Sequence, residues 1–418
     1  MSDRIKAPRG TFDVLPEQQA ARRRIEETAR GLLEEAGYGR IDTPVFEETE
    51  LFARGVGEAT EVVQKQMFTF EDQGGRSLTL RPEATAAICR AYIEHGMQTR
   101  PQPVKLWSSG PFFRHERPQA GRYRQFHQID AEAIGSDSPL VDAELILLVW
   151  DLITRLGVEG VELRLGSLGS PEARAAYAEE LRSFLRGREG ELAKEVRDRI
   201  DLNPLRAFDS ADEGTQAVMA DAPLLLDRLE GEDAARVAAV RELLDRAGVP
   251  YKVDATMVRG LDYYAHTIFE LHCDRLGAQS QVGGGGRYDG LIEALGGPAT
   301  PASGWAVGVE RLALALGEED RPPTVDVFIV ADEGARERAL ALATELRRAG
   351  ISTDLDLAGR SLKGQMKQAD RSGARQAVLL EGNAAHLRDM VTGEQRDADL
   401  TSPVEELRAA LAQGPEEG

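Results

Sequence analysis

The sequence predicts an α+β protein in which a large domain with a mixed, mainly antiparallel sheet carries a helical insertion and precedes a small α/β domain. Two strand-like segments, at 104–113 and 123–134, flank a charged loop, which is the pattern of an antiparallel hairpin. Residues from about 167 to 248 are rich in Ala, Leu, Glu and Arg at helical spacing. Strands alternate with helices beyond residue 321, as in a parallel sheet.

The first part of the chain contains three segments with helical periodicity. Their apolar residues recur every three or four positions, and Pro or Gly marks a limit of each: 17–36, 82–96 and 138–157. Extended segments are expected at 40–47, where Pro44 interrupts the run, and at 251–257 and 265–272. Two glycine-rich segments follow, QVGGGGRYDGL at 281–291 and GWAVGVERLALAL at 304–316.

A change of pattern after Arg321-Pro322-Pro323 predicts a domain boundary. Apolar strands are expected at 325–331, 351–357 and 376–381, with helices near 335–349 and 361–372 between them. Alternation of this kind brings the strands into one parallel sheet. We therefore expect one domain over residues 1–321 and a separate α/β domain over residues 322–418.

The formal net charge of −20 argues against a nucleic-acid partner when it is considered alone. Proteins that bind nucleic acid usually present a basic surface, because their cations replace the counterions around phosphate. A local arginine-rich groove can nevertheless coexist with an acidic exterior. Arginine supplies nearly all of the positive charge, and it is the better bidentate partner of phosphate and carboxylate. Adaptation to high salt and codon bias are both open as explanations of the acidity.

The composition favours a cytoplasmic protein without a membrane partner. The N-terminal residues carry charge but no apolar signal-peptide core, and no stretch has the apolar length of a membrane span. The two cysteines, Cys89 and Cys273, form no CxxC pair and suggest no disulfide framework. The six histidines have no HExxH or CxxC companion, so we expect no metal site built from protein side chains.

Residues 113–132, FRHERPQAGRYRQFHQIDAE, combine a basic loop with two strands, which can hold cations and ring faces over a nucleotide. On a strand, Arg114 and Glu116 would point to the same face, and Phe126 would face back across the hairpin. Such charges can equally belong to a surface hairpin without a role. GVER places Arg311 at the start of an apolar helical run, where a lone arginine is usually a solvated helix end. Neither segment is a Walker loop.

Taken together and in order, these segments resemble the signature motifs of class II aminoacyl-tRNA synthetases. GYGRIDTPVFE is similar to motif 1, FRHE with RQFHQ to motif 2, and GVER to motif 3. VRGLDYY and GGGGRYDGL are similar to the two motifs of the histidine-specific family, which KAPRGTFDVLP and LTLRPEATAA also resemble. The resemblance covers almost the whole chain. It departs from the family pattern at small residues away from the charged functional positions: Ala84, Asp130 and Ala131.

The resemblance implies a class II catalytic domain, a C-terminal anticodon-binding domain, and ATP-dependent ligation of L-histidine to tRNA(His) through a histidyl-adenylate. It implies that Arg114 bridges the α-phosphate and the histidine carboxylate. Arg259 would reach the same phosphate from the opposite side, so both are expected to be catalytic. Mg²⁺ is expected on the phosphates, held mostly by ATP oxygens and water. Motif 1 implies a homodimer with Pro44 at its interface.

The remaining site residues are likewise implied by the resemblance. The ATP-binding set is Arg114, Glu116 at the adenine amine, Phe126 on the adenine face, and Arg311 at the γ-phosphate. The histidine-binding set is Glu83, Thr85, Arg114, Gln128, Glu132, Arg259, Tyr263, Tyr264 and Tyr288. The tRNA-contacting set is Arg117, Gln119 and Arg122 in the basic loop.

Two other functions compete with this interpretation. A paralogue of the catalytic domain serves as a non-catalytic histidine-sensing regulatory subunit; it would lack the ATP-site arginines and the C-terminal domain, both of which this sequence has. A related synthetase for another amino acid would lack VRGLDYY and GGGGRYDGL. For Arg259 alone, the structural alternative is an ion pair with Asp262 or another nearby acid.

Overall fold

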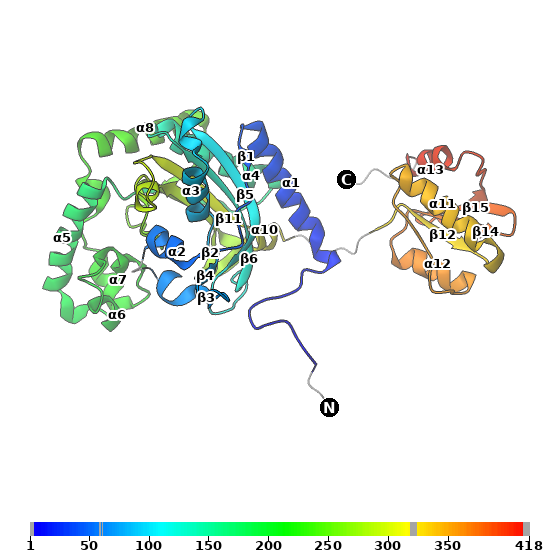
Figure 1. Ribbon diagram of the computed structural model, residues 1–418, viewed down its shortest axis with the longest axis horizontal. Coiled ribbons are helices and arrows are strands. Elements are labelled where there is room, and N and C mark those ends of the chain that lie inside the picture. The colour runs from blue at the N-terminus through cyan, green and yellow to red at the C-terminus, as the bar shows by residue number, and fades with distance from the viewer. Residues whose placement is uncertain (1–3, 58–59, 61, 318–323, 413–418) are drawn as a thin grey trace. The chain divides into compact units, whose positions relative to one another are not determined.

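The computed structural model describes residues 4–57, 60, 62–317 and 324–412. They form two compact units, which we describe separately: a larger one that includes residues 21–317 and a smaller one that includes residues 324–412 (Figure 1). The predicted domain boundary at 321–322 lies outside the described residues. No helix in the described part of the chain has both the length and the apolar character that crossing a membrane requires.

An eight-stranded sheet is the centre of the larger unit (Figure 1). The six inner strands are antiparallel to one another, whereas the short strand at each edge pairs in parallel with the strand beside it. The predicted mixed, mainly antiparallel sheet is therefore confirmed. The order across the sheet is β1 (Gly39–Arg40), β5 (Val104–Phe113), β6 (Gln125–Ile134), β11 (Ala302–Gly308), β10 (Gln281–Arg287), β9 (Ala265–Cys273), β7 (Val161–Ser167) and β8 (Lys252–Val253).

Alternation along the strands gives the sheet two different faces. On β6, Ile129, Ala131 and Ala133 belong to a core formed with α1 (Gln19–Glu35), α4 (Pro139–Leu156), α8 (Gly231–Ala247) and α10 (Val309–Leu316). The residues between them point to the opposite face because successive side chains alternate. That face is covered by α3 (Thr85–Glu94) and by helices of the insertion.

The insertion is helical, as expected, between β7 and β8. It contains α5 (Pro171–Gly187), α6 (Lys194–Arg197) and α7 (Glu213–Met219) with short 3-10 turns, and it ends with α8. Tyr177, Leu181 and Leu185 of α5 recur at helical spacing and join the core that includes α3. Two strand predictions change here: β7 was not expected, and the strand expected over 251–257 is reduced to two residues.

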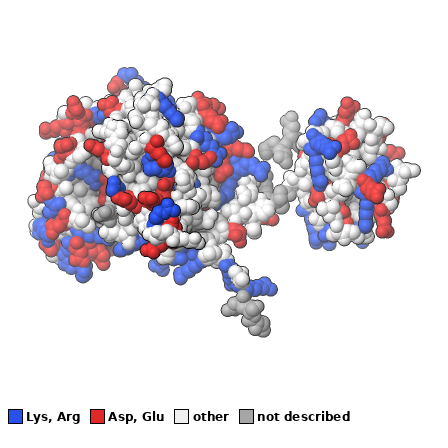
Figure 2. Space-filling model, viewed as in Figure 1, with Lys and Arg blue, Asp and Glu red and all other residues white. Residues whose placement is uncertain are grey.

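A small sheet lies beside the larger one, with the order β2 (Phe46–Glu48), β4 (Ser77–Leu80) and β3 (Phe68–Glu71), all antiparallel. The short helices α2 (Thr49–Val56) and α9 (Leu291–Ala294) both contact α3. On the face shown in Figure 2, acidic and basic side chains are intermixed over the larger unit, so the net negative charge does not exclude local arginine clusters.

A fully buried ion pair ties β10 to α4. Arg287 donates from Nη2 and Nε to Asp142 Oδ1 at 2.7 and 3.0 Å, and neither side chain has any exposed surface. Thr267 donates to the other carboxylate oxygen at 2.9 Å, and Arg287 Nη1 donates to the Ser136 carbonyl at 2.9 Å. Both charges of this pair are therefore matched, which a low-dielectric interior requires.

The smaller unit is an α/β domain with the strand order β13 (Thr353–Leu355), β12 (Val327–Ala331), β14 (Gln376–Glu381), β15 (Ala384–Asp389) and β16 (Gln395–Asp397). The three predicted strands pair in parallel, and α11 (Arg336–Arg348) and α12 (Leu362–Arg371) contact opposite faces of β12. The antiparallel extension by β15 and β16, and the final helix α13 (Pro403–Ala412), were not expected.

Candidate active site

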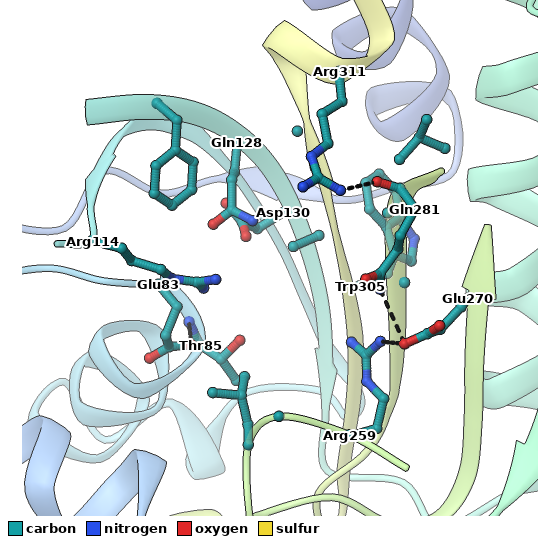
Figure 3. A pocket seen from close by; sticks show the side chains of 18 of the residues that line it. Glu83, Thr85, Arg114, Gln128, Asp130, Arg259, Glu270, Gln281, Trp305 and Arg311 are labelled. Atoms are coloured by element: carbon teal, nitrogen blue, oxygen red, sulfur yellow. Dashed lines mark hydrogen bonds and ion pairs between the residues drawn. The ribbon is translucent and has the colours of Figure 1, made fainter. Parts of the chain in front are cut away.

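A pocket of about 330 Å³ opens on the α3 face of the larger sheet. Its walls come from β6, β10, β11, the start of α10, the loop after β5 and the segment 259–264. Arg114, Arg259 and Arg311, which are far apart in the sequence, all line it (Figure 3). Such a cluster of guanidinium groups suits an anionic ligand with several phosphate or carboxylate oxygens.

Arg114 lies just beyond the end of β5, so the predicted strand alternation of Arg114 and Glu116 is wrong. Both residues lie in a tight turn, where Glu116 N donates to the Arg114 carbonyl at 2.8 Å. Arg114 Nε donates to the Pro82 carbonyl at 2.9 Å, and its guanidinium carbon lies 5.4 Å from the Phe126 ring centroid. These contacts aim the rest of the guanidinium into the pocket (Figure 3).

Arg259 enters from the opposite side of the pocket and pairs with Glu270, not with Asp262 (Figure 3). Its Nη1 donates to Glu270 Oε1 at 2.6 Å, and its guanidinium carbon lies 4.9 Å from the Tyr264 ring. His272 contacts the second oxygen of Glu270 at 2.8 Å. Burial opposes the charged form of Arg259, but Tyr264 and Glu270 outweigh it and raise the Arg259 pKa. Arg259 is therefore a fixed cation.

Arg311 lies in the first turn of α10, as the helical periodicity predicted, and points back toward β10. Its Nε donates to the Gly121 carbonyl at 3.0 Å, and its Nη1 donates to the Gln281 carbonyl. Burial, followed by the nearby charge of Arg122, lowers its pKa. An arginine held among other cations gains stabilisation when a polyanion binds, because the anion relieves their mutual repulsion.

Glu132 of β6 is buried behind the pocket wall; it does not itself line the pocket, but it contacts the lining residues Thr85 and Tyr288. Thr85 Oγ1 donates to its Oε1 at 2.7 Å, and Tyr288 OH donates to its Oε2. Burial raises the Glu132 pKa well above its usual range. Tyr263 packs edge-on against Tyr288, with the ring centroids 5.6 Å apart, and closes the aromatic side of the pocket.

The Glu83 carboxylate caps the N-terminus of α3. Its two carboxylate oxygens accept the backbone N–H groups of Thr85 at 2.7 Å and Ala86 at 3.0 Å, so it caps the helix in place of a side chain at the capping position. Gln128 lies on β6 with its side-chain oxygen buried and without a donor among the described residues. Acceptors therefore dominate this side of the pocket.

Asp130 corrects one expectation from the sequence. The sequence departs from the family pattern at Asp130, and we expected this residue to lie away from the charged functional positions. Asp130 instead lines the pocket and is only 1% exposed. Its pKa rises to about 8, first because of burial and then because of Glu83. The signal was present in the sequence, since Gln128, Asp130 and Glu132 alternate on one strand face.

The glycines of GGGGRYDGL are explained by the close approach of neighbouring strands. A side chain at Gly284 would start 2.7 Å from the Phe269 carbonyl and 2.9 Å from Arg259 Nη1. One at Gly283 would start 2.9 Å from the Ala306 carbonyl. Only glycine permits this packing, so β10 supplies bare backbone to the pocket beside Arg259.

The other predicted residues lie nearer the surface. Glu116 and Arg122 line the pocket and form an ion pair at 3.5 Å. Arg117 and Gln119 are exposed on the same loop but do not line the pocket. Pro44 is exposed just before β2, beside a different hollow. Of the described lining residues, the sequence reasoning named neither Glu270 nor Gln281, both of which contact the arginines.

The model of the histidyl-tRNA synthetase family matches residues 10–312, which contain the whole pocket. This chain belongs to the histidyl-tRNA synthetase family. An anticodon-binding-domain model matches residues 324–410, the smaller unit. The histidine–tRNA ligase of Halothermothrix orenii is 45% identical over 97% of this chain and 99% of its own length. That of Rubrobacter xylanophilus is 48% identical over 94% of this chain and 96% of its own length.

Solved structures give the same family. The apo histidyl-tRNA synthetase of S. aureus superimposes with a TM-score of 0.81 and 39% identity, covering 97% of this chain and all of that one. A Bacillus halodurans protein described as an ATP phosphoribosyltransferase regulatory subunit/histidyl-tRNA synthetase has a TM-score of 0.67 at 24% identity, so its likeness concerns the fold alone. The anticodon-binding match and the close relatives do not favour the regulatory alternative.

Proposed function

We propose that this chain is a histidine–tRNA ligase. It joins the carboxylate of L-histidine to the α-phosphorus of ATP and releases pyrophosphate, and it then transfers the histidyl group from the adenylate to a hydroxyl at the 3′ end of tRNA(His), releasing AMP. The observation that supports this most strongly is the convergence of Arg114, Arg259 and Arg311 in one pocket beside the buried Glu132.

The three arginines suit the adenylation step. Two anions must approach each other, and the pentacoordinate transition state accumulates charge on its equatorial oxygens. Arg114 and Arg259 enter from opposite sides of the pocket, so together they can neutralise the carboxylate and the α-phosphate as charge develops. Arg311 binds the γ-phosphate. Phe126 stacks on the adenine face, and Glu116 accepts a hydrogen bond from the adenine amine.

Histidine selection follows from buried acceptors with fixed geometry. Glu132 is held by two hydroxyl donors, so its carboxylate can accept an imidazole N–H without moving. Tyr264 contacts the opposite side of the imidazole ring, and Tyr263 and Tyr288 line the space around the ring. A site built in this way rejects analogues that leave its polar groups unpaired, often by roughly 10⁴-fold. The α-amino group goes to Glu83, Thr85 and Gln128.

Mg²⁺ would enter with ATP and supply charge neutralisation on the phosphates, held mainly by ATP oxygens and water. The acids nearest the arginines support this arrangement, because Glu116 and Glu270 are each already paired with an arginine. Among the described residues, no group of three or more His, Cys, Asp or Glu side chains has a metal-binding arrangement. We therefore assign no side chain as a direct Mg²⁺ ligand.

The partner interactions extend this proposal beyond the pocket. Arg117, Gln119 and Arg122 on the loop after β5 contact the 3′ end of the tRNA, and the helical insertion contacts the acceptor stem. Catalysis belongs to residues 1–321 and anticodon binding to residues 322–418. A homodimer forms with Pro44 at its interface, where Val45 and Phe46 are exposed apolar neighbours. The enzyme acts in the cytoplasm, where ATP and tRNA meet the ribosome.

The experiment that tests this function is ATP–pyrophosphate exchange with each of the twenty amino acids, followed by charging of tRNA(His). Exchange with histidine alone and histidylation of the tRNA are expected. Exchange with a different amino acid would instead identify another synthetase. The absence of exchange together with retained histidine binding would favour the regulatory alternative.

A further inference from the structure

One side of the pocket has hydrogen-bond acceptors that the described chain leaves without donors. Gln128 Oε1 is buried and has none. Asp130 accepts only a long bond from Ser108 Oγ at 3.4 Å, and no cation of the described chain lies within ion-pair distance of it. The charges of Arg81 and Arg114 act on Asp130 only from a distance, and a buried carboxylate with no cation in contact is costly, so this arrangement indicates a ligand that brings positive charge and N–H donors.

The strand geometry directs these acceptors to the same place. Gln128 and Asp130 are two residues apart on β6 and therefore point to one face. The register places Asp130 between Ser108 of β5 and Ala306 of β11, neither of which is charged. The charged groups facing this region from the neighbouring elements are Arg81 after β4, Glu83 before α3, Arg114 after β5, Glu132 on β6, and Glu310 and Arg311 on α10.

We propose that Asp130 is a further substrate-binding residue that holds the α-ammonium group of the amino-acid substrate, with Gln128 beside it. Both oxygens of Glu83 already accept N–H groups of α3, so Glu83 has less capacity to serve the ammonium alone. Arg114 lies on the same side of the pocket and is free to take the α-carboxylate (Figure 3). This inference rests on the proposed function, because it assigns one group of that substrate.

Binding of the ammonium group should release a proton from Asp130. Burial and the charge of Glu83 raise the Asp130 pKa to about 8, so the carboxyl is mostly protonated in the free enzyme at pH 7. The ammonium stabilises the carboxylate, and the Asp130 proton leaves to solvent as the ion pair forms. Histidine affinity then rises with pH by up to about tenfold per unit until the pH reaches the Asp130 pKa, and levels off above it.

The direct test is calorimetric titration of the full-length protein with histidine at pH 7, in two buffers with different ionisation enthalpies. Asp130→Asn keeps the shape of the side chain but cannot ionise. We expect the wild type to release more protons per histidine than this variant, because burial raises the Asp130 pKa in the free enzyme and the ammonium favours the carboxylate. Asp137→Asn removes the same charge from an exposed position nearby and serves as the matched control.

A second measurement identifies the ligand group. Histidine and histamine carry the amino group, whereas imidazolepropionate lacks it. Asp130→Asn should weaken the first two by about tenfold, the equivalent of losing one charge-assisted hydrogen bond, and leave imidazolepropionate unchanged. The KM for ATP in pyrophosphate exchange should also be unchanged. Equal losses for all three ligands, or a parallel change for ATP, would overturn the assignment.

The outcomes separate this inference from the proposed function. If the wild type activates histidine but Asp130→Asn binds it as tightly and releases as many protons, the inference alone fails. If the wild type does not activate histidine, the proposed function fails first. Should Asp130→Asn not fold, as judged by circular dichroism, Asp130→Ser replaces it. With either variant, an unchanged affinity for histamine overturns the proposal.

Discussion

Replacing Gly304 by alanine tests how the pocket holds its buried carboxylate. Gly304 of β11 is paired with Glu132 of β6 across the sheet, and the missing side chain leaves room for that carboxylate. A methyl group at this position would overlap Glu132 Oε2 and would lie 2.5 Å from Glu132 Cδ and 2.7 Å from the Ala131 carbonyl oxygen. The backbone at Gly304 is not in the left-handed region, so the effect is steric.

The size of the effect follows from these distances. Carbon atoms pack at about 3.5 Å, so the contact with Cδ alone requires the carboxylate to move by about 1 Å, and the overlap with Oε2 requires at least that. That shift lengthens the hydrogen bonds that Thr85 and Tyr288 donate to Glu132. A misplacement of about 1 Å in a binding group can cost on the order of 100-fold in rate. We therefore expect kcat/KM for histidine to fall by about 100-fold and stability to fall by about 1–3 kcal/mol.

The assay is histidine-dependent pyrophosphate exchange, with the KM for ATP measured in parallel and urea unfolding as the stability measurement. The KM for ATP should stay at the wild-type value, because the proposed function assigns the displaced carboxylate to the imidazole and not to ATP. Gly39→Ala is the matched control, since its nearest neighbour would be the Lys105 carbonyl at an ordinary 3.9 Å. Wild-type histidine kinetics in a folded Gly304→Ala protein would refute the steric reasoning.

Three further predictions concern the arginines and the acidic composition. Arg259→Ala should reduce pyrophosphate exchange by on the order of 100- to 1000-fold with an unchanged circular dichroism spectrum; exchange at the wild-type rate would remove its catalytic role. Arg287→Met should destabilise the protein by about 3–5 kcal/mol in urea, because Asp142 stays buried and keeps only the long ion pair with Arg236 at 3.9 Å, whereas the exposed Arg246→Ala should cost under about 0.5 kcal/mol. If the net charge of −20 is an adaptation to salt, aminoacylation should persist in molar salt, and loss of activity there would exclude that explanation.

Much of the pocket could be anticipated because it is built from recognisable segments, but its three-dimensional arrangement could not be worked out from local patterns. Arg114, Arg259 and Arg311 are too far apart in the chain for periodicity to bring them together. Only the resemblance to a known family linked them. Local reasoning failed where it assumed a strand: β5 ends at Phe113, so Arg114 and Glu116 lie in a turn.

The missed features share a physical cause, which is that their partners are distant in sequence. Glu270 was overlooked as the partner of Arg259 because Asp262 is nearer in the chain, although β9 is what brings Glu270 across. The strand β15 adds to the edge of β14, and β16, which has three residues, all polar, pairs in turn with β15. The departure at Asp130 was noticed, but its burial in the pocket depends on α3 packing over β6.

The run of glycines on β10 limits how this enzyme can evolve. A pocket wall made of side chains can change by single substitutions. The wall that β10 forms is peptide backbone packed against the Phe269 and Ala306 carbonyls, and any residue larger than glycine would collide with these carbonyls. Altered amino-acid selectivity would therefore have to arise on β6, at the start of α3 or at Tyr263, Tyr264 and Tyr288, where side chains rather than main chain line the pocket. An engineer seeking to reprogramme the enzyme would randomise those positions and leave β10 untouched.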